Sequence, residues 1–146
     1  MVTMDSDGNR VKLVCVNWYG AHMEDMVVNG LDRQPIQKIA AIIKELGFNC
    51  VRLPWALDTF FENPIVRPER LSANPELVGG TAMELLDAAV NALSDQEIIV
   101  IPNNHISTAQ WCCPPEDGLW YTEKVSNIAN LAHICMYVFF YSLGSL

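Results

Sequence analysis

Apolar stretches and amphipathic helical patterns alternate along most of the chain, and this alternation restricts the fold more than any other feature. Stretches rich in β-branched residues at 11–17, 48–54 and 97–103 are typical of buried strands. Between them, apolar residues recur at helical spacing over 35–46 and 82–93. Strands that are apolar on both faces and joined by amphipathic helices predict an α/β fold, in which helices pack on a parallel sheet.

Local signals mark where these elements begin and end. Pro35 stands at a favoured first-turn position, and Gly47 follows the last apolar residue of the same helix. Thr81 and Glu84 have the spacing of a capping box for the second helix. Pro54 is expected to end the second strand.

The loops that follow the first two strands are long, whereas the returns from helix to strand are short. In parallel α/β folds, functional sites lie at the carboxyl ends of the strands. Polar and aromatic residues gather there in this sequence: Asn17, Trp18 and Tyr19 at the end of the first strand, Arg52, Pro54 and Trp55 in and after the second, and Asn103, Asn104 and His105 at the end of the third, followed by Trp111 and Trp120 in the next loop. If the strands are parallel neighbours, these groups converge on one mouth.

Amides, an arginine, a histidine and several indoles suit a sugar, because indole faces stack on sugar C–H surfaces and polar groups bond hydroxyls. Each residue also has an ordinary structural interpretation. Arg52 can pair with a structural carboxylate, His105 can be a plain core or surface histidine, the asparagines can form turns, and the tryptophans can be core or rim residues. The acidic residues of the loops are interpreted as solvated charge: Glu24, Asp25, Asp58, Glu62, Glu116 and Asp117. The coincidence of three clusters on one side favours a site.

Composition limits the partners. The 146 residues carry a net charge of −8, which argues against nucleic acid and anionic membrane surfaces. No signal peptide is visible at the beginning of this chain. The apolar residues 131–146 are a weak candidate for a membrane segment, and a buried element or a divergent tail is preferred.

The cysteine pattern predicts thiols and no metal site. Five cysteines, an odd number, and no visible signal peptide favour free thiols in a reducing compartment: Cys15, Cys50, Cys112, Cys113 and Cys135. No zinc spacing, phosphate loop, dinucleotide fingerprint or GxSxG motif is present, so no cofactor is expected.

Three segments together resemble glycoside hydrolase family 5, the cellulase family, and its plant members in particular. They are "CVNWYG", "LGFNCVRLPW" and "IVIPNNHIS", with "WCC" and "LW" downstream, and the resemblance covers about residues 9–124. It implies a (β/α)8 TIM barrel, of which this chain holds about the first three βα units. It also implies a retaining hydrolase of β-linked polysaccharides such as glucan or mannan.

The resemblance implies specific roles for site residues. Arg52 corresponds to the arginine that supports the nucleophilic carboxylate, and His105 to the histidine beside the scissile sugar. The expected substrate-binding residues are Trp18, Asn103, Asn104, His105, Trp111 and Trp120. Asn103 stands where many members of the family have aspartate. The family resemblance also suggests a secreted protein.

The two catalytic glutamates that the family requires are not expected in this chain. They follow the fourth strand, in an Asn-Glu-Pro motif, and the seventh strand, whereas no Asn-Glu-Pro occurs here. A full barrel has about 250 residues. We therefore expect a partial barrel domain over 1–124 and a divergent apolar tail over 125–146. The chain is expected to be inactive because both catalytic glutamates are missing. It is also expected to be poorly stable alone, because open strand edges invite association.

The first hypothesis is therefore that the chain is a member of an enzyme family with an incomplete active site. Two alternatives to it remain. One is a carbohydrate-binding fragment that holds sugar without cleaving it. The other is a small complete domain of flavodoxin type, which is ranked last because the loop after the first strand lacks a Gly-rich phosphate cradle.

Overall fold

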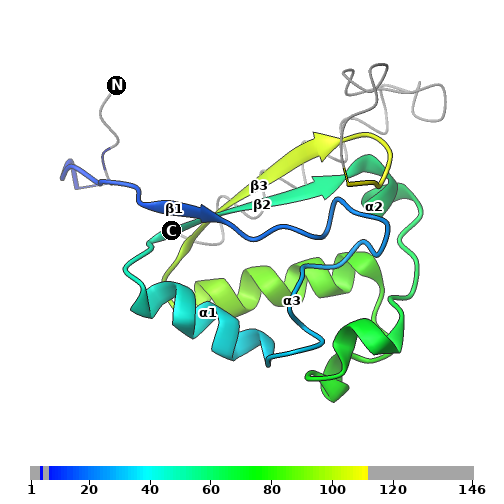
Figure 1. Cartoon of the computed structure of the whole chain (residues 1–146). Helices are drawn as coiled ribbons and strands as arrows, with labels where there is room; N and C mark the ends of the chain where they lie inside the picture. Colours follow the sequence, from blue (N-terminus) through cyan, green and yellow to red (C-terminus); the bar gives the residue numbers. More distant parts are fainter. Residues whose placement is uncertain (1–3, 5–6, 112–146) are drawn as a thin grey trace.

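The computed structural model describes residue 4 and residues 7–111. A three-stranded sheet lies over two longer helices, and short helical segments occupy the connection between β2 and α3 (Figure 1). The elements in chain order are β1 (Cys15–Asn17), α1 (Ile36–Glu45), β2 (Cys50–Ala56), α2 (Leu57–Phe61), η1 (Pro68–Leu71), η2 (Pro75–Leu77), α3 (Ala82–Ser94) and β3 (Ile99–Ile106).

The sheet is parallel throughout, with the strands in the order β1-β2-β3. Both α1 and α3 lie on one of its faces (Figure 1). The predicted alternation of strands and helices on a parallel sheet is confirmed. The capping box is also present, since Thr81 N donates to Glu84 Oε2 at 2.8 Å and Glu84 N to Thr81 Oγ1 at 3.4 Å.

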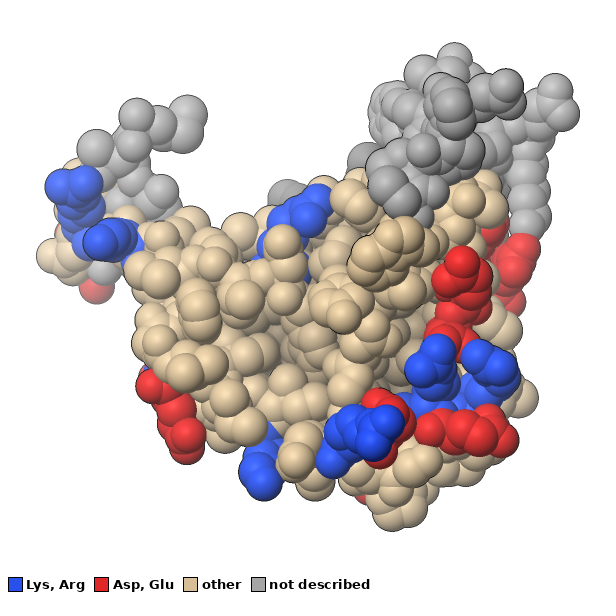
Figure 2. All heavy atoms as spheres, viewed as in Figure 1, with Lys and Arg blue, Asp and Glu red and all other residues tan. Residues whose placement is uncertain are grey.

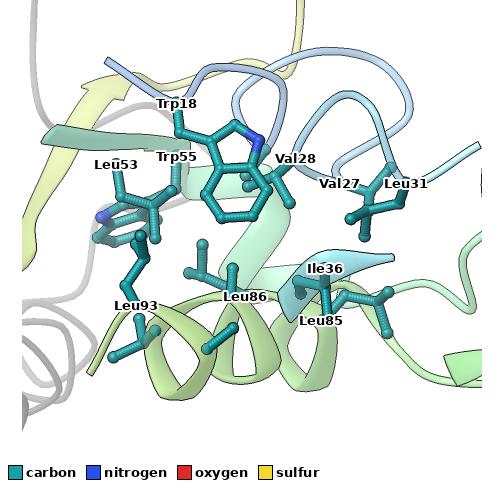
Figure 3. Packing of buried hydrophobic residues seen from close by; sticks show 14 of the residues in the cluster. Trp18, Val27, Val28, Leu31, Ile36, Leu53, Trp55, Leu85, Leu86 and Leu93 are labelled. Atoms are coloured by element: carbon teal, nitrogen blue, oxygen red, sulfur yellow. The ribbon is translucent and has the colours of Figure 1, made fainter. Parts of the chain in front are cut away.

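The core fills the space between the sheet and the helices. Figure 3 shows Leu53 and Trp55 of β2 directed toward Leu86 and Leu93 of α3. All four side chains are at most 3% exposed. The alternate residues of β2 therefore point away from the helices, and Arg52 is one of them.

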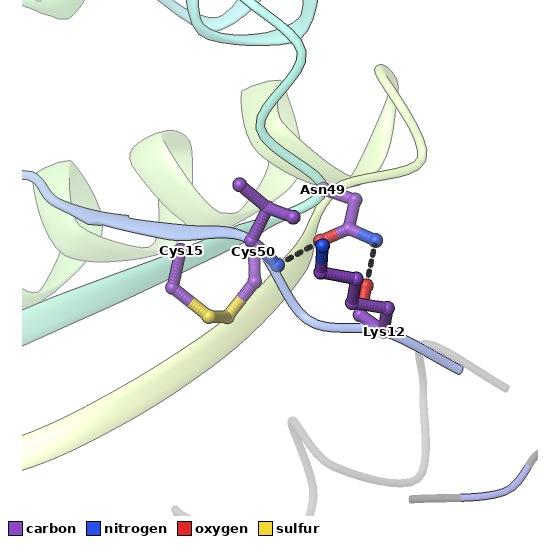
Figure 4. Close-up of a disulfide and its surroundings, with 5 residues drawn as sticks. Lys12, Cys15, Asn49 and Cys50 are labelled. Atoms are coloured by element: carbon purple, nitrogen blue, oxygen red, sulfur yellow. Dashed lines mark hydrogen bonds between the residues drawn. A yellow bond between two sulfur atoms is a disulfide. The ribbon is translucent and has the colours of Figure 1, made fainter. Parts of the chain in front are cut away.

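The first strand is shorter than predicted. Only Cys15–Asn17 pairs as a strand with β2, although the apolar pattern begins at residue 11. Before it, the Asn49 side chain replaces ladder bonds by accepting from Val14 N at 2.8 Å and donating to Lys12 O at 2.9 Å (Figure 4). An asparagine side chain thus holds backbone that the pattern assigned to the strand.

The second and third strands both end later in the chain than predicted. β2 continues through Pro54 to Ala56, and β3 continues beyond Asn103 to Ile106. Pro54 is tolerated because β1 has already ended, so the proline faces a neighbouring strand on one side only. The polar residues of the third cluster, Asn103, Asn104 and His105, consequently lie within β3.

Cys15 and Cys50 form a disulfide bond, so the expectation of free thiols is wrong for these two residues (Figure 4). The parallel register places them opposite each other, with their Cα atoms 4.3 Å apart. A separation of 35 residues hides this proximity in the sequence. Disulfides persist in oxidising environments, which removes the basis for assigning a reducing compartment. Cys112, Cys113 and Cys135 lie outside the described residues.

The amino end of α1 is capped from a distant part of the chain. Pro35 precedes the helix and provides no side-chain cap. Asn74, which is fully buried, accepts from Ile36 N at 2.7 Å and donates to Leu31 O at 2.7 Å and Gln34 O at 3.0 Å. One buried amide therefore joins the loop before α1 to the turn between η1 and η2.

Candidate functional site

A pocket of about 280 Å³ lies at the carboxyl ends of the strands. Its walls come from all three strands and from the loops that follow β1 and β3. The lining residues are Asn17, Tyr19, His22, Arg52, Pro54, His105 and Trp111. The convergence predicted from the three polar clusters is thus present in the structure, at the edge where parallel α/β folds carry their sites.

Arg52 joins two residues of β3 at the base of this pocket. Its Nη2 donates to Asn103 Oδ1 at 2.5 Å and lies 3.2 Å from His105 Nδ1. Because a guanidinium can only donate, His105 Nδ1 acts as the acceptor, and the ring proton is then on Nε2. With Nδ1 as the acceptor, His105 has an N–H donor on its other nitrogen.

The strand alternation separates the two neighbouring asparagines. Asn103 contacts Arg52, whereas Asn104 pairs in register with Trp55, whose side chain belongs to the core. Asn104 Oδ1 is buried without a hydrogen-bond partner among the described residues. The structure therefore brings Asn103 and His105 together and leaves Asn104 on the other face of the sheet.

The predicted tryptophans have different locations. Trp18 is 6% exposed, packs within the core (Figure 3) and donates from Nε1 to Asn29 O at 2.9 Å, so it does not reach the pocket. Its structural interpretation, core packing, agrees with this position. Trp111 is 65% exposed and lines the pocket. Trp120 lies outside the described residues.

Tyr19 forms an aromatic pair with Trp111 at the pocket. The ring centroids are 6.2 Å apart and the planes are inclined by 78°. The loop can close here because Gly20 has φ +128° and no side chain. A Cβ at this position would lie 2.5 Å from Val27 O and 2.6 Å from Asn29 N. Tyr19 belongs to the predicted cluster after the first strand, but the sequence did not single it out from Trp18.

The short helix α2 fixes the loops on both sides of the pocket. Thr59 Oγ1 donates to Ala21 O at 2.7 Å, in the loop after β1. Asp58 N donates to Ser107 O at 3.1 Å, and Asp58 Oδ2 accepts from Ala109 N at 3.1 Å, in the loop after β3. The pocket is therefore braced by hydrogen bonds before any ligand binds.

Asp25 is an internal ion-pair partner and not the solvated charge that the sequence suggested. Its side chain is 15% exposed and pairs with both Arg67 and Arg70. Burial opposes ionisation, but the hydrogen bonds from the two arginines outweigh it and hold the pKa of Asp25 below its ordinary value. In Figure 2, basic and acidic side chains adjoin at the lower right, over the segment that contains η1 and η2.

His22 is the site residue that the sequence analysis missed. It is 6% exposed, and its ring contacts His105. Burial lowers its pKa, and the charges of His105 and Arg52 lower it further. Glu24 and a hydrogen bond with the Pro54 backbone act in the opposite direction without compensating. The only sequence signal is a position two residues after Gly20, in a long loop on the side of the site.

Acidification is expected to destabilise the fold through His22. In the folded chain the pKa of His22 lies below its ordinary value of 6.5, so the unfolded chain binds more protons just below that pH. The free energy of unfolding should therefore decrease as the pH falls from about 7 to about 5. Urea unfolding at both pH values measures this decrease. The decrease should be smaller for His22→Phe, and an equal decrease in both proteins would contradict the assignment.

The family of the chain follows from comparison with known proteins. The model of the cellulase family, glycosyl hydrolase family 5, matches residues 4–135. The chain belongs to glycosyl hydrolase family 5. A "Glycosyl hydrolase 5 family protein" of Chamaecyparis obtusa is 38% identical over 78% of this chain and 23% of the relative. The match of the family model extends beyond residue 124, and the proposed domain boundary there stays a prediction.

Solved members of this family have the same fold. The catalytic domain of the major endoglucanase from Xanthomonas campestris pv. campestris has a TM-score of 0.78 at 25% identity, over 94% of this chain and 38% of that chain. An endocellulase from Pyrococcus horikoshii in complex with cellotetraose has a TM-score of 0.68 at 28% identity, over 81% and 31% of the two chains. The expected partial TIM barrel is confirmed. The chain spans about a quarter of the length of the curated relatives it matches, and it covers 23%, 26% and 30% of three of them.

The described residues include neither a membrane-spanning helix nor a metal-binding cluster. Among the described residues, no helix is long and apolar enough to cross a membrane. The same part of the chain contains no group of three or more histidine, cysteine or acidic side chains that could hold a metal ion. The apolar residues 131–146 lie outside it.

Proposed function

We propose that this chain forms one wall of the sugar-binding cleft of a β-glycoside hydrolase that acts on β-linked polysaccharides such as glucan or mannan. The observation that carries the proposal is the group formed by Arg52, Asn103 and His105 at the base of the pocket. The family membership and the cellotetraose complex of a related endocellulase support a sugar as the ligand.

The geometry suggests a role for each residue. His105 offers its Nε2–H as a donor to a sugar hydroxyl, because Nδ1 is engaged by Arg52. Arg52 has further N–H donors with which it could hold a carboxylate ionised. Trp111 and Tyr19, both substantially exposed, provide apolar faces against which a sugar ring can stack.

The chain by itself is proposed to bind sugar without hydrolysing it. Retaining hydrolysis needs two carboxyl groups about 5 Å apart, one as acid/base and one as nucleophile. The seven described residues that line the pocket include no aspartate or glutamate, and no Asn-Glu-Pro occurs in the sequence. The catalytic pair of the parent enzyme would have to come from residues other than these.

Calorimetry and a turnover assay test this function on the 146-residue chain. Titration with cello-oligosaccharides and manno-oligosaccharides should give saturable binding, and the set that binds more tightly indicates the glycoside class. No reducing ends should appear from a soluble β-glucan. Absence of binding to every oligosaccharide would reject the sugar site, and a measurable hydrolysis rate would reject the inactive state.

Arg52→Met is expected to weaken oligosaccharide binding at least about tenfold. The substitution keeps much of the side-chain volume but leaves Asn103 Oδ1 and His105 Nδ1 without their donor, and a charge-assisted hydrogen bond contributes about 1.5–3 kcal/mol. Arg33→Met is the matched control, because the Arg33 side chain is 83% exposed and pairs only with its neighbour Asp32 in the described hydrogen bonds. Equal affinities of the two variants would contradict the role of Arg52.

A further inference from the structure

His22 lies behind His105, and the function proposed above assigns it no role. The two imidazole rings meet edge to face, with centroids 4.9 Å apart and planes inclined by 83°. His105 is exposed, whereas His22 is 6% exposed and borders the same pocket. His22 is therefore placed to restrict how the ring of His105 can turn.

The orientation of His105 decides what the pocket offers to a ligand. With Nδ1 directed at Arg52, the ring presents an N–H donor on its other nitrogen. A ring flip would exchange the two nitrogens and break the contact with the guanidinium. An exposed histidine has little to prevent that flip except the side chains that pack against its ring.

The hydrogen bond that the His22 ring makes goes to the Pro54 backbone and not to His105. His22 Nδ1 is buried and has no hydrogen-bond partner among the described residues. An unpartnered buried nitrogen costs free energy, so the useful property of the ring is its flat shape and not its polarity. Neutrality also matters, because a charged ring would lie beside Arg52 and His105, with Glu24 as the only compensating charge among the interactions described for it.

The backbone of the same residue orders a second part of the pocket. His22 O accepts from Gln110 N at 3.0 Å, next to Trp111 in the chain. The loop after β3 is thus attached to the loop after β1 at the residue whose side chain supports His105. Both the polar base and the aromatic rim of the pocket depend on the position of His22.

We propose that His22 is a positioning residue, whose ring holds His105 in the orientation where Nδ1 accepts from Arg52 and Nε2–H faces the pocket. The proposal depends on the function above only in naming a sugar hydroxyl as the group that Nε2–H would meet. The orientation of His105 itself can be measured without any sugar.

Nitrogen-15 NMR of the imidazoles in the 146-residue chain at about pH 7.5 provides the test. The wild-type chain should show His105 as the Nε2–H tautomer. His22→Ala should convert this signal into the average of a freely exchanging ring, and His22→Phe, which restores a flat ring, should restore the single tautomer. A mixed tautomer in the wild type, or an unchanged tautomer in His22→Ala, would overturn the proposal.

A second variant separates positioning from general loss of stability. Asn74→Ala removes buried hydrogen bonds outside the pocket, so it should lower stability while leaving the His105 tautomer unchanged. If Asn74→Ala alters the tautomer as much as His22→Ala does, the effect is structural and the proposal fails.

Oligosaccharide affinity gives an independent readout. His22→Ala should weaken binding about tenfold, as expected for one lost hydrogen bond, and His22→Phe should bind within about twofold of the wild type. If no sugar binds but the tautomers behave as expected, the positioning role stands and the proposed sugar site falls. If the wild type binds sugar while its His105 tautomer is mixed, the proposed sugar site stands and the positioning role of His22 falls.

Discussion

Removal of the Cys15–Cys50 disulfide is expected to lower the free energy of unfolding by about 4 kcal/mol. The bond closes a loop over a sequence separation of 35 residues. In the chain-entropy model, a loop of this length restricts the unfolded chain by about that amount. The double variant Cys15→Ala/Cys50→Ala should therefore show a much lower urea midpoint than the oxidised wild type.

Reduction provides the matched control for this prediction. A reductant should shift the midpoint of the wild type nearly to that of the double variant, and it should leave the double variant unchanged. Alkylation followed by mass spectrometry identifies the bonded cysteines before the unfolding experiment. Free thiols at both positions in the purified, non-reduced chain would contradict the bond, and equal midpoints for both proteins would contradict its stabilising effect.

Asn74→Ala is expected to cost about 3 kcal/mol. The alanine removes the acceptor for Ile36 N and the donor to Leu31 O and Gln34 O, all in a fully buried position. A lost helix cap costs about 1 kcal/mol, and each buried polar group left without a partner adds about 1–3 kcal/mol. Because no solvent reaches the position of the side chain, water does not readily replace the amide.

Asn91→Ala serves as the comparison for this second prediction. Asn91 is exposed on α3, and its substitution should change the free energy of unfolding by less than about 0.5 kcal/mol. Both variants are compared with the wild type by urea unfolding under oxidising conditions. Similar values for Asn74→Ala and Asn91→Ala would show that the long-range cap of α1 contributes little.

The sequence predicted the layer arrangement because that arrangement depends on local periodicity. Helical spacing over 35–46 and the capping box at Thr81 identified α1 and α3 almost to the residue. Strand boundaries depend instead on which groups elsewhere in the chain form hydrogen bonds with the backbone of the strand. β1 begins later than predicted because the Asn49 side chain bonds the backbone before it, and β2 passes Pro54 because the neighbouring strand has stopped there.

The site residues at the ends of strands could be predicted from the sequence. Those that come from distant loops could not. Arg52, Asn103 and His105 follow from strand position and from the resemblance to family 5. His22 and the disulfide of Cys15 with Cys50 depend on contacts between segments far apart in the chain, which no local pattern encodes. Trp18 was predicted as a site residue but belongs to the core. From the sequence alone, a large aromatic residue after a strand can equally well pack in the core or line the rim of a site.

The order of the strands in space repeats their order in the chain, β1-β2-β3, and this has a consequence for biosynthesis. Each strand that leaves the ribosome can pair with the strand made just before it, without waiting for a distant segment. The disulfide joins the first pair of strands and needs no segment that follows β2. Asn74, in contrast, emerges 38 residues after the helix end that it caps. The nascent chain can therefore assemble its sheet from the amino end, whereas α1 receives its cap only after the loop beyond β2 has been synthesised.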